Sequence, residues 1–290
     1  MNILLAVDSS SHAKHAVQMV THLSGEVNLF ILYVVDVPAL KHAYLFSAGS
    51  ENDFEGYRKE VARLSQHVLH ETRDALLPFA RKIQLIADNG DPAECIIQTA
   101  EEHHADLILL GHRGMTESSP FLLGGVSQKV ATYAPCSVLV CKADTPVLDR
   151  ILLAVDGSDA SKKSAQFLEA LPFKGPLHLM IEMVWSPPPT SLLASVSKSS
   201  IVAPKTTSAK SKGEAFLRKI AEPFQKGPYE VEIEWKCGDP PLAILESAKQ
   251  HNVQMIVVGA RGLKGIKRFL LGSVSQKVLE HAPCSVLVVR

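Results

Sequence analysis

A glycine-rich segment in the second half of the chain has the residue types and spacing of an anion-binding loop. It reads Gly259-x2-Gly262-x9-Gly272-Ser273 and begins where an apolar run ends. If a helix starts at Ser273, free backbone N–H groups, the positive end of the helix dipole and the Ser273 and Ser275 hydroxyls converge there, which suits phosphate. The segment also contains four cations, Arg261, Lys264, Lys267 and Arg268. For a generic G-x-x-G, the alternative is that the glycines only turn the chain.

The same pattern occurs 148 residues earlier, and other blocks repeat at that offset. The pairs are Ile3–Asp8 with Ile151–Asp156, Gly90–Pro92 with Gly238–Pro240, Gly111–Gly114 with Gly259–Gly262, Leu123–Val130 with Leu271–Val278, and Ala134–Val140 with Ala282–Val288. One register held over this length indicates a duplicated domain rather than a solenoid repeat. We therefore predict two domains, residues 1–142 and 149–290, joined by a short linker.

The elements that position these loops alternate between strand and helix. Continuous apolar runs predict buried parallel strands at 2–7, 27–35, 82–87, 106–110 and 137–140, and again at 150–155, 177–184, 229–235, 255–258 and 285–289. Helical patterns fall between them, at 11–23, 55–77, 92–104, 125–133, 160–171, 213–224, 240–250 and 273–281. This alternation predicts an α/β fold of two doubly wound domains. The apolar stretch at 39–46 is expected to be a loop, and Ser186–Lys212 a disordered insertion or a lid.

Composition limits the classes of partner. The 290 residues are 46% hydrophobic and have a formal net charge of zero, so no global field attracts nucleic acid or an acidic membrane. No apolar run reaches the roughly 18 residues of a membrane helix, and the run at Ile3–Val7 is too short for a signal peptide. Five cysteines, an odd number, favour a reducing compartment. We expect a soluble, cytoplasmic protein that binds neither nucleic acid nor membrane.

The second glycine segment resembles the G-x2-G-x9-G-(S/T) signature of the ATP-binding universal stress proteins. The runs Ile151–Ser158 and Ala282–Val288 are similar to that family's opening and closing strands. Because both halves show the resemblance, the chain looks like a tandem universal stress protein. The resemblance implies a five-stranded parallel sheet in the order 3-2-1-4-5 in each domain, with nucleotide across the carboxyl ends of strands one and four. That is also where ligands bind in doubly wound sheets.

The resemblance implies an ATP site in the second domain, with Mg²⁺ as a further ligand. Asp156 would lie near the ribose or a phosphate-bound metal, and Val184 would meet adenine through its backbone. Asp156 is also expected to cap the following helix, which is compatible with that role. The implied site residues are Ala154, Val155, Asp156, Val184, Val258, Gly259, Gly262, Gly272, Ser273, Val274 and Ser275.

The first domain departs from the signature at its last position, where Gly125 replaces Ser or Thr. The missing hydroxyl removes a hydrogen bond of roughly 1.5–3 kcal/mol, and Glu117 offsets Arg113 in a loop that has Ser118–Pro120 in place of cations. The first domain is therefore a weaker nucleotide site or a purely structural partner. The residues in position for the weaker site are Asp8, Val34, Gly111, Gly114, Gly124, Gly125 and Ser127.

Two further residue sets have a functional and a structural interpretation. His12-x2-His15 and His103-His104 have spacings that metal ligands use, but no Cys or acidic cluster completes either set, so exposed helix residues are expected. Cys136 and Cys284, in matched Ala-Pro-Cys-Ser turns, are expected to pack rather than to react.

Three classes of function follow from these patterns. The resemblance implies an ATP-binding regulatory or sensing protein of stress adaptation. The rivals are a slow ATPase or nucleotide transferase, and a scaffold that binds a small ligand in the first domain. P-loop and G-x-G-x-x-G motifs are both missing from the sequence. We also expect an intramolecular pseudo-dimer through Ser137–Cys141 and Ser285–Val289, because unpaired apolar edge strands aggregate, and a homodimer is possible.

Overall fold

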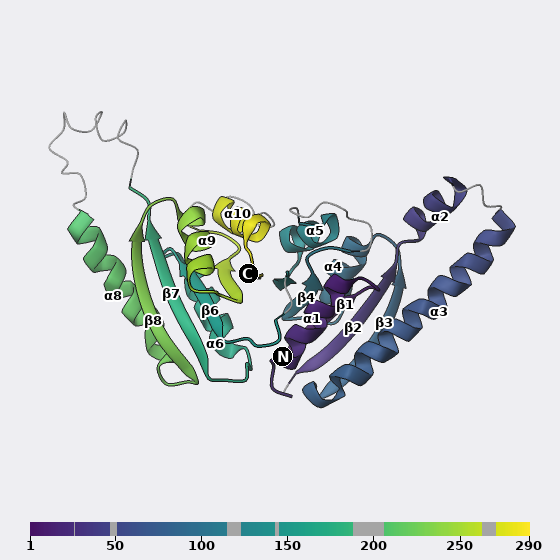
Figure 1. Cartoon of the computed structure of the whole chain (residues 1–290), viewed down its shortest axis with the longest axis horizontal. Coiled ribbons are helices and arrows are strands. Elements are labelled where there is room, and N and C mark those ends of the chain that lie inside the picture. Colours follow the sequence, from purple (N-terminus) through teal and green to yellow (C-terminus); the bar gives the residue numbers. More distant parts are fainter. Residues whose placement is uncertain (26, 47–50, 115–122, 143–144, 188–205, 263–270) are drawn as a thin grey trace. The chain divides into compact units, whose positions relative to one another are not determined.

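The computed structural model describes the chain apart from residues 26, 47–50, 115–122, 143–144, 188–205 and 263–270. The chain forms two compact units, and their principal division falls between Val147 and Leu148 (Figure 1). Among the described residues, no helix is long and apolar enough to cross a membrane.

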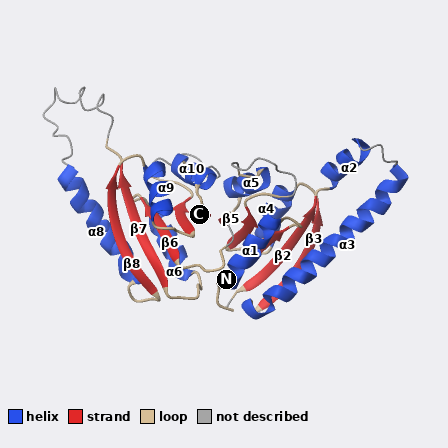
Figure 2. Ribbon diagram, in the orientation of Figure 1, coloured by secondary structure: helices blue, strands red, loops and turns tan. Residues whose placement is uncertain are grey.

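The first unit alternates strands and helices as the apolar runs predict (Figure 2). Its described strands are β1 (Asn2–Val7), β2 (Asn28–Val35), β3 (Lys82–Asn89), β4 (Leu107–Gly111) and β5 (Ser137–Cys141). Its described helices are α1 (Ser11–Thr21), α2 (Val37–Phe46), α3 (Glu51–Leu76), α4 (Pro92–Glu102) and α5 (Gly125–Tyr133), with a 3-10 turn at Leu77–Phe79. The strands pair in parallel in the order β3-β2-β1-β4-β5. The predicted order 3-2-1-4-5 is confirmed.

The second unit repeats this arrangement. Its described strands are β6 (Arg150–Val155), β7 (Leu177–Trp185), β8 (Tyr229–Cys237), β9 (Met255–Gly259) and β10 (Ser285–Val289). Its described helices are α6 (Asp159–Ala170), α8 (Thr206–Phe224), α9 (Pro240–Gln250) and α10 (Ser273–His281). The strands are again parallel, in the order β8-β7-β6-β9-β10. Each half is therefore the doubly wound α/β domain that the sequence predicts.

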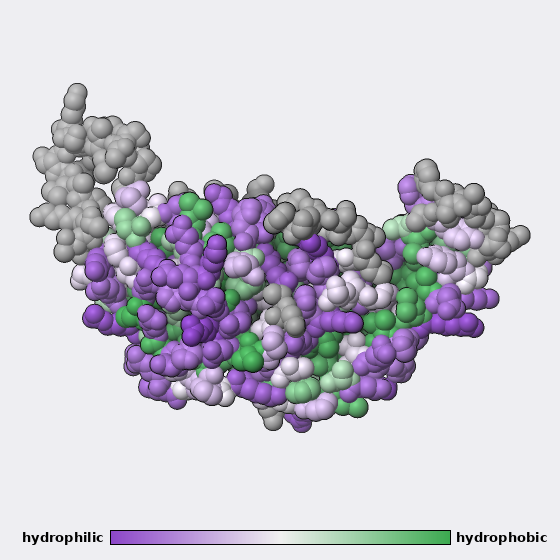
Figure 3. All heavy atoms as spheres, viewed as in Figure 1, coloured by the Kyte–Doolittle hydropathy of each residue, from purple (hydrophilic) through white to green (hydrophobic). Residues whose placement is uncertain are grey.

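Burial explains why the strands read as apolar runs. Ile3, Leu4 and Leu5 of β1 and Ile151 to Leu153 of β6 are all fully buried, since helices flank each sheet. Residues just before two helices cap them: the Ser10 hydroxyl accepts from the Ala13 N–H, and the Asp91 carboxylate accepts from the two N–H groups that follow Pro92. In Figure 3 polar side chains cover most of the visible described surface, with hydrophobic ones between them, which is normal for a folded domain.

Helix α2 is a correction to the expected loop at 39–46. Its start carries a signal that sequence reasoning passed over, because the Asp36 carboxylate accepts from the Ala39 N–H at 2.9 Å, as an N-cap does. Tyr44 packs against α3, with ring centroids 5.6 Å from those of Phe54 and Tyr57. This contact joins residues too far apart for local periodicity to reveal.

The second correction concerns Ser186–Lys212. Its last part is helical, because α8 starts at Thr206 rather than near Gly213. Gly213 lies inside the helix where the backbone passes the Trp235 indole, and a Cβ there would be 2.5 Å from its Cδ1 atom. The remainder of the expected disordered insertion or lid, residues 188–205, lies outside the described residues.

Candidate functional site

The residues predicted for the nucleotide site gather at the carboxyl edge of the second sheet. Strand β6 pairs with β9 on one side and with β7 on the other, so the ends of the three strands are neighbours. Ala154 and Val155 end β6 and Asp156 follows it, Val184 is the next-to-last residue of β7, and Val258 and Gly259 end β9. Gly262 follows β9 in the loop, Gly272 is the N-cap of α10, and Ser273, Val274 and Ser275 are its first residues.

Gly262 lies directly against the Asp156 carboxylate. A Cβ atom on Gly262 would be 2.5 Å from Asp156 Oδ2, a separation that real Cβ atoms do not show. The other oxygen, Oδ1, accepts from the Ser158 N–H at 2.9 Å. The expectation that Asp156 caps the following helix is wrong, because the N-cap of α6 is Ser158, whose hydroxyl accepts from the Ser161 N–H. A side chain at position 262 would therefore displace the Asp156 carboxylate or the loop, whereas the φ of Gly262 is not positive and does not itself call for glycine.

Hydrogen bonds fasten both ends of the glycine loop to the sheet. The Gly272 N–H donates to the Ala260 carbonyl at 2.7 Å, and the Ala260 N–H donates to the Val289 carbonyl at 2.7 Å. The Ser275 side chain, only 4% exposed, donates to the Gly259 carbonyl at 2.6 Å. Gly272 occupies the N-cap position of α10 and has no side chain that could cap the helix. No side chain of the N-cap residue therefore accepts from the N–H groups of the first turn.

The two serines of this helix start therefore differ. The Ser275 hydroxyl proton is used inside the protein, contrary to the expectation that this hydroxyl faces a phosphate. Ser273 is exposed on the first turn. Of the loop cations, Arg261 is described and is half-buried, whereas Lys264, Lys267 and Arg268 lie outside the described residues.

The first domain repeats this geometry with a looser fit. Asp8 follows β1, and a Cβ on Gly114 would be 3.2 Å from the Oδ2 atom of Asp8. The Gly124 N–H donates to the His112 carbonyl at 2.8 Å, and the buried Ser127 hydroxyl donates to the same carbonyl at 2.8 Å. Val34 lies near the end of β2, Gly111 ends β4 and Gly125 starts α5. Residues Glu117 and Ser118–Pro120 lie outside the described part of the chain.

A histidine cluster distinguishes the first domain from the second. The His112 and His12 rings meet edge to face with centroids 4.5 Å apart, and His15 lies 6.0 Å from His12. The expectation that His12 and His15 are exposed is wrong, since both are half-buried. Burial, together with the charges of His12 and Arg113, lowers the pKa of His112 to about 4. Within the described residues, no three His, Cys, Asp or Glu side chains are arranged to hold a metal.

This shifted pKa predicts an acid sensitivity of the first domain. The unfolded chain binds a proton at His112 near pH 6.5 and the folded chain only near pH 4, so stability is fully present above pH 6.5 and falls as the pH drops between these values. The loss amounts to about 3 kcal/mol. Replacing His112 with alanine, the residue at the matching position 260, should remove that contribution. Native-state hydrogen exchange of β1 and β4 amides at pH 4 to 7 measures it, and an unchanged pH slope in H112A would contradict the assignment.

A buried charge cluster that was not predicted from the sequence surrounds Glu182, two residues before Val184 on β7. Glu182 of β7 is fully buried, accepts a short hydrogen bond from the Ser247 hydroxyl and pairs with Lys236 of β8 at 3.1 Å. Lys236 also contacts the Ser247 hydroxyl at 2.6 Å and Glu234 at 3.1 Å. Strand register places Leu32 of the first domain at the position of Glu182, so the cluster belongs to the second domain only.

The carboxylate and the ammonium of this cluster are shifted in the same direction. Burial raises the pKa of Glu182 above its usual range, although Ser247 and Lys236 act against it. Partial burial acts to lower the pKa of Lys236, but its bonds to Glu234 and the charge of Glu182 outweigh it and raise the pKa. Lys236 therefore offsets the free-energy cost of burying the charged form of Glu182.

Comparison with known proteins matches both halves. The model of the universal stress protein family matches residues 1–142 and 148–290. Universal stress protein YxiE of Bacillus subtilis is 32% identical over 151 residues, which is 50% of this chain and all of that protein. A universal stress protein structure from Archaeoglobus fulgidus has a TM-score of 0.67 and 23% identity, covering 100% of this chain and 98% of its own.

A third match carries a ligand in its own structure. It is a universal stress protein in complex with cAMP, 23% identical, with a TM-score of 0.36, covering 49% of this chain and 97% of its own. The architecture of both units is thus found in a full-length solved structure, and the family model accounts for both repeats. This chain belongs to the universal stress protein family, with one family domain in each half.

Proposed function

We propose that the second domain binds an adenine nucleotide, ATP with Mg²⁺, as the regulatory ligand of a stress-adaptation protein. The observation that supports this most is the fit of Gly262 against the Asp156 carboxylate, within a loop that leads to an uncapped helix start at Ser273. A helix start with free N–H groups favours phosphate. The neighbouring strand ends supply the apolar surface for the nucleoside.

The proposal assigns a task to each part of this edge. The N–H groups of Ser273, Val274 and Ser275 and the Ser273 hydroxyl bind phosphate oxygens, and Arg261 adds charge. The strand ends around Ala154 and Val258 hold the nucleoside, with adenine against the Val184 backbone. In this scheme Ser275 acts through its N–H, because its hydroxyl holds the loop.

Asp156 fits the Mg²⁺ that the proposal includes. One of its oxygens accepts the Ser158 N–H and the other faces Gly262, so the carboxylate lies at the loop and would bind the ion through one oxygen. Mg²⁺ in nucleotide sites is commonly held by one or two carboxylates, with phosphate oxygens and waters completing the octahedron. Such an ion neutralises phosphate charge. Since Asp156 already accepts a backbone N–H, it is a poor general base, and we expect hydrolysis to be slow at most.

Titration calorimetry of the full chain with Mg·ATP tests the proposal. Replacing Ser273 with alanine removes a phosphate donor and should weaken binding about ten- to a hundredfold, as expected for a bond to a charged group. Ser208 is exposed on α8, and the matched control S208A should bind ATP with the affinity of the wild type. Absence of ATP binding by the wild-type chain, or equal affinity in S273A, would reject the assignment.

A gain of affinity is expected at the first domain when Gly125 is replaced by serine. Gly125 is the first residue of α5 and does not have a positive φ, so serine fits its backbone and restores the missing hydroxyl. The added donor should strengthen nucleotide binding there by about 1–2 kcal/mol. Calorimetry in a chain whose second site is disabled isolates the effect. Equal first-site affinity with and without the substitution would show that the hydroxyl is not what limits this site.

A further inference from the structure

A cavity of about 340 Å³ opens at the amino ends of β6, β7 and β8, at the edge of the second sheet away from the proposed nucleotide site. Its lining includes Arg150, His178, Met180, Glu230, Glu232 and His251, of which His251 ends α9. The volume lies at the lower end of the range for small-molecule sites.

The first domain fills the corresponding space with its own side chains. Strand register matches Phe30 with Met180, and the helix ends match His103 with His251. The Phe30 and His103 rings contact each other with centroids 4.6 Å apart. In the second domain a flexible thioether replaces the phenyl ring, which leaves the space open. The cavity is thus a property of one copy of a duplicated fold and not a general gap of the architecture.

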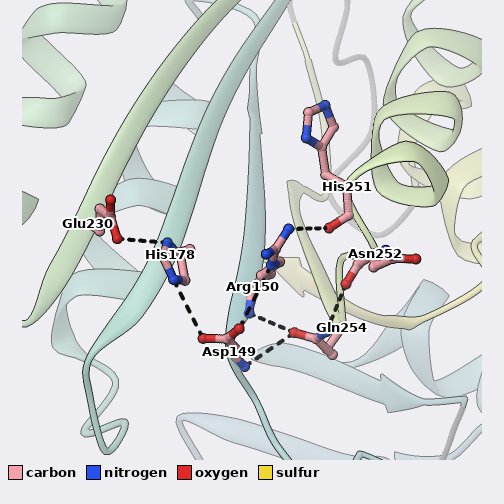
Figure 4. A network of polar contacts seen from close by, with 7 residues as sticks. All are labelled: Asp149, Arg150, His178, Glu230, His251, Asn252 and Gln254. Atoms are coloured by element: carbon pink, nitrogen blue, oxygen red, sulfur yellow. Dashed lines mark hydrogen bonds and ion pairs between the residues drawn. The ribbon is translucent and has the colours of Figure 1, made fainter.

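A polar network holds the mouth of the cavity in place (Figure 4). Gln254 accepts from the Arg150 N–H at 2.6 Å and donates to the Asn252 carbonyl at 2.7 Å. The Arg150 guanidinium donates to the His251 carbonyl at 3.2 Å and lies 3.8 Å from Asp149. His178 pairs with Glu230 at 2.9 Å. These contacts pair the Arg150 guanidinium with Asp149 and give the Glu230 carboxylate a polar partner in His178.

Glu232 is the lining carboxylate that faces the apolar part of the cavity. It is exposed, it has no hydrogen bond or ion pair to any described residue, and it stands directly across from Met180 in the β7–β8 register. Beside it lies the apolar Met180 side chain, which is 6% exposed. Figure 4 shows the His251 imidazole turned away from Arg150, and this ring has no hydrogen-bond partner among the described residues. The cavity therefore combines the apolar Met180 side chain with the Glu232 carboxylate, which no described residue bonds or pairs with.

We propose that this cavity binds a small organic ammonium ion, with its apolar part on Met180 and its cationic group beside Glu232. A cationic group would balance the charge of the Glu232 carboxylate, and an apolar body would displace water from the surface of Met180. The site is separate from the nucleotide edge and does not depend on ATP binding.

NMR of the full chain carrying ¹³C-methyl methionine tests this with benzylammonium as the probe. The Met180 signal, identified by its loss in M180L, should shift on titration, with affinity in the millimolar range expected for so small a ligand. Binding should be lost in M180F, which introduces the residue of the first domain. It should weaken about two- to fivefold in E232Q, as expected for a partly solvated ion pair. The control E222Q changes the same charge on exposed α8 and should bind normally.

Three outcomes separate support from rejection. A shift of Met180 with benzylammonium that is absent with benzoate and weaker with benzyl alcohol supports the proposal. Equal shifts with benzyl alcohol and benzylammonium would overturn the cationic assignment. The absence of any Met180 shift at millimolar probe would overturn the site itself. Because M180F could disturb packing, M180L serves as the folded reference, and tryptophan fluorescence of each variant verifies that the second domain is intact.

Discussion

Replacing Gly262 with valine is expected to abolish nucleotide binding by the second domain, with a loss of at least about a hundredfold in ATP affinity. A Cβ at this position would lie 2.5 Å from Asp156 Oδ2, and valine adds two further methyl groups. Either the carboxylate must leave its place or the loop must move away from the strand ends. Both changes displace the groups that we assign to ribose and phosphate. Titration calorimetry with Mg·ATP measures the loss.

The first domain supplies the matched control for this substitution. Gly114 faces Asp8 as Gly262 faces Asp156, so G114V makes the same change in the other copy and should leave second-domain affinity unaltered. Thermal unfolding of both variants shows that the fold is retained. An ATP affinity of G262V equal to that of the wild type would contradict the assignment of the nucleotide site.

Replacing Lys236 with methionine should destabilise the second domain by about 3–5 kcal/mol, because it leaves the buried Glu182 without its cation. Both tryptophans of the chain, Trp185 and Trp235, lie in the second domain, so their fluorescence in urea reports its unfolding separately. The loss should shrink as the pH falls. Burial raises the pKa of Glu182, so a buried Glu182 without Lys236 is most costly above its raised pKa and is relieved once it binds a proton.

A double variant distinguishes a lost charge partner from lost packing. Leucine occupies the position of Glu182 in the first domain, at Leu32, so E182L in the K236M background removes both charges with a side chain that this fold accepts. We expect most of the stability to return, since replacing a buried ion pair by apolar residues is often neutral. If K236M and the double variant unfold at the same urea concentration, the charge of Glu182 is not the cause.

The topology could be predicted from the sequence because its causes are local. Parallel strands buried on both faces must be apolar along their length, and β1, β4, β6 and β9 each read as such a run. The glycine loops follow these runs at a fixed spacing, so the place of the loops in the fold also follows from the sequence. The helix ranges could be predicted for the same reason, since capping residues such as Ser10 and Asp91 lie next to the helices that they cap.

What escaped prediction depends on contacts between residues far apart in the chain. Glu182 appears in the sequence as a single charge inside an apolar strand, and its partners come from β8 and α9. His112 meets His12 only after β4 and α1 pack together. The hydrogen bond of the Ser275 hydroxyl could not be predicted for the same reason, because its acceptor, the Gly259 carbonyl, comes near only in the folded loop. The sequence spacing indicated that the Ser275 hydroxyl would donate to a phosphate, but in the folded loop this hydroxyl donates to the Gly259 carbonyl.

The most direct test is the nucleotide content of the purified chain. Acid extraction of the full-length protein, followed by identification and quantification of released adenine nucleotide, should give about one nucleotide per chain for the wild type and for G114V, and almost none for G262V. This pattern would place the tight site in the second domain. A wild-type chain without nucleotide after incubation with Mg·ATP, or a G262V chain that retains it while G114V does not, would contradict the account.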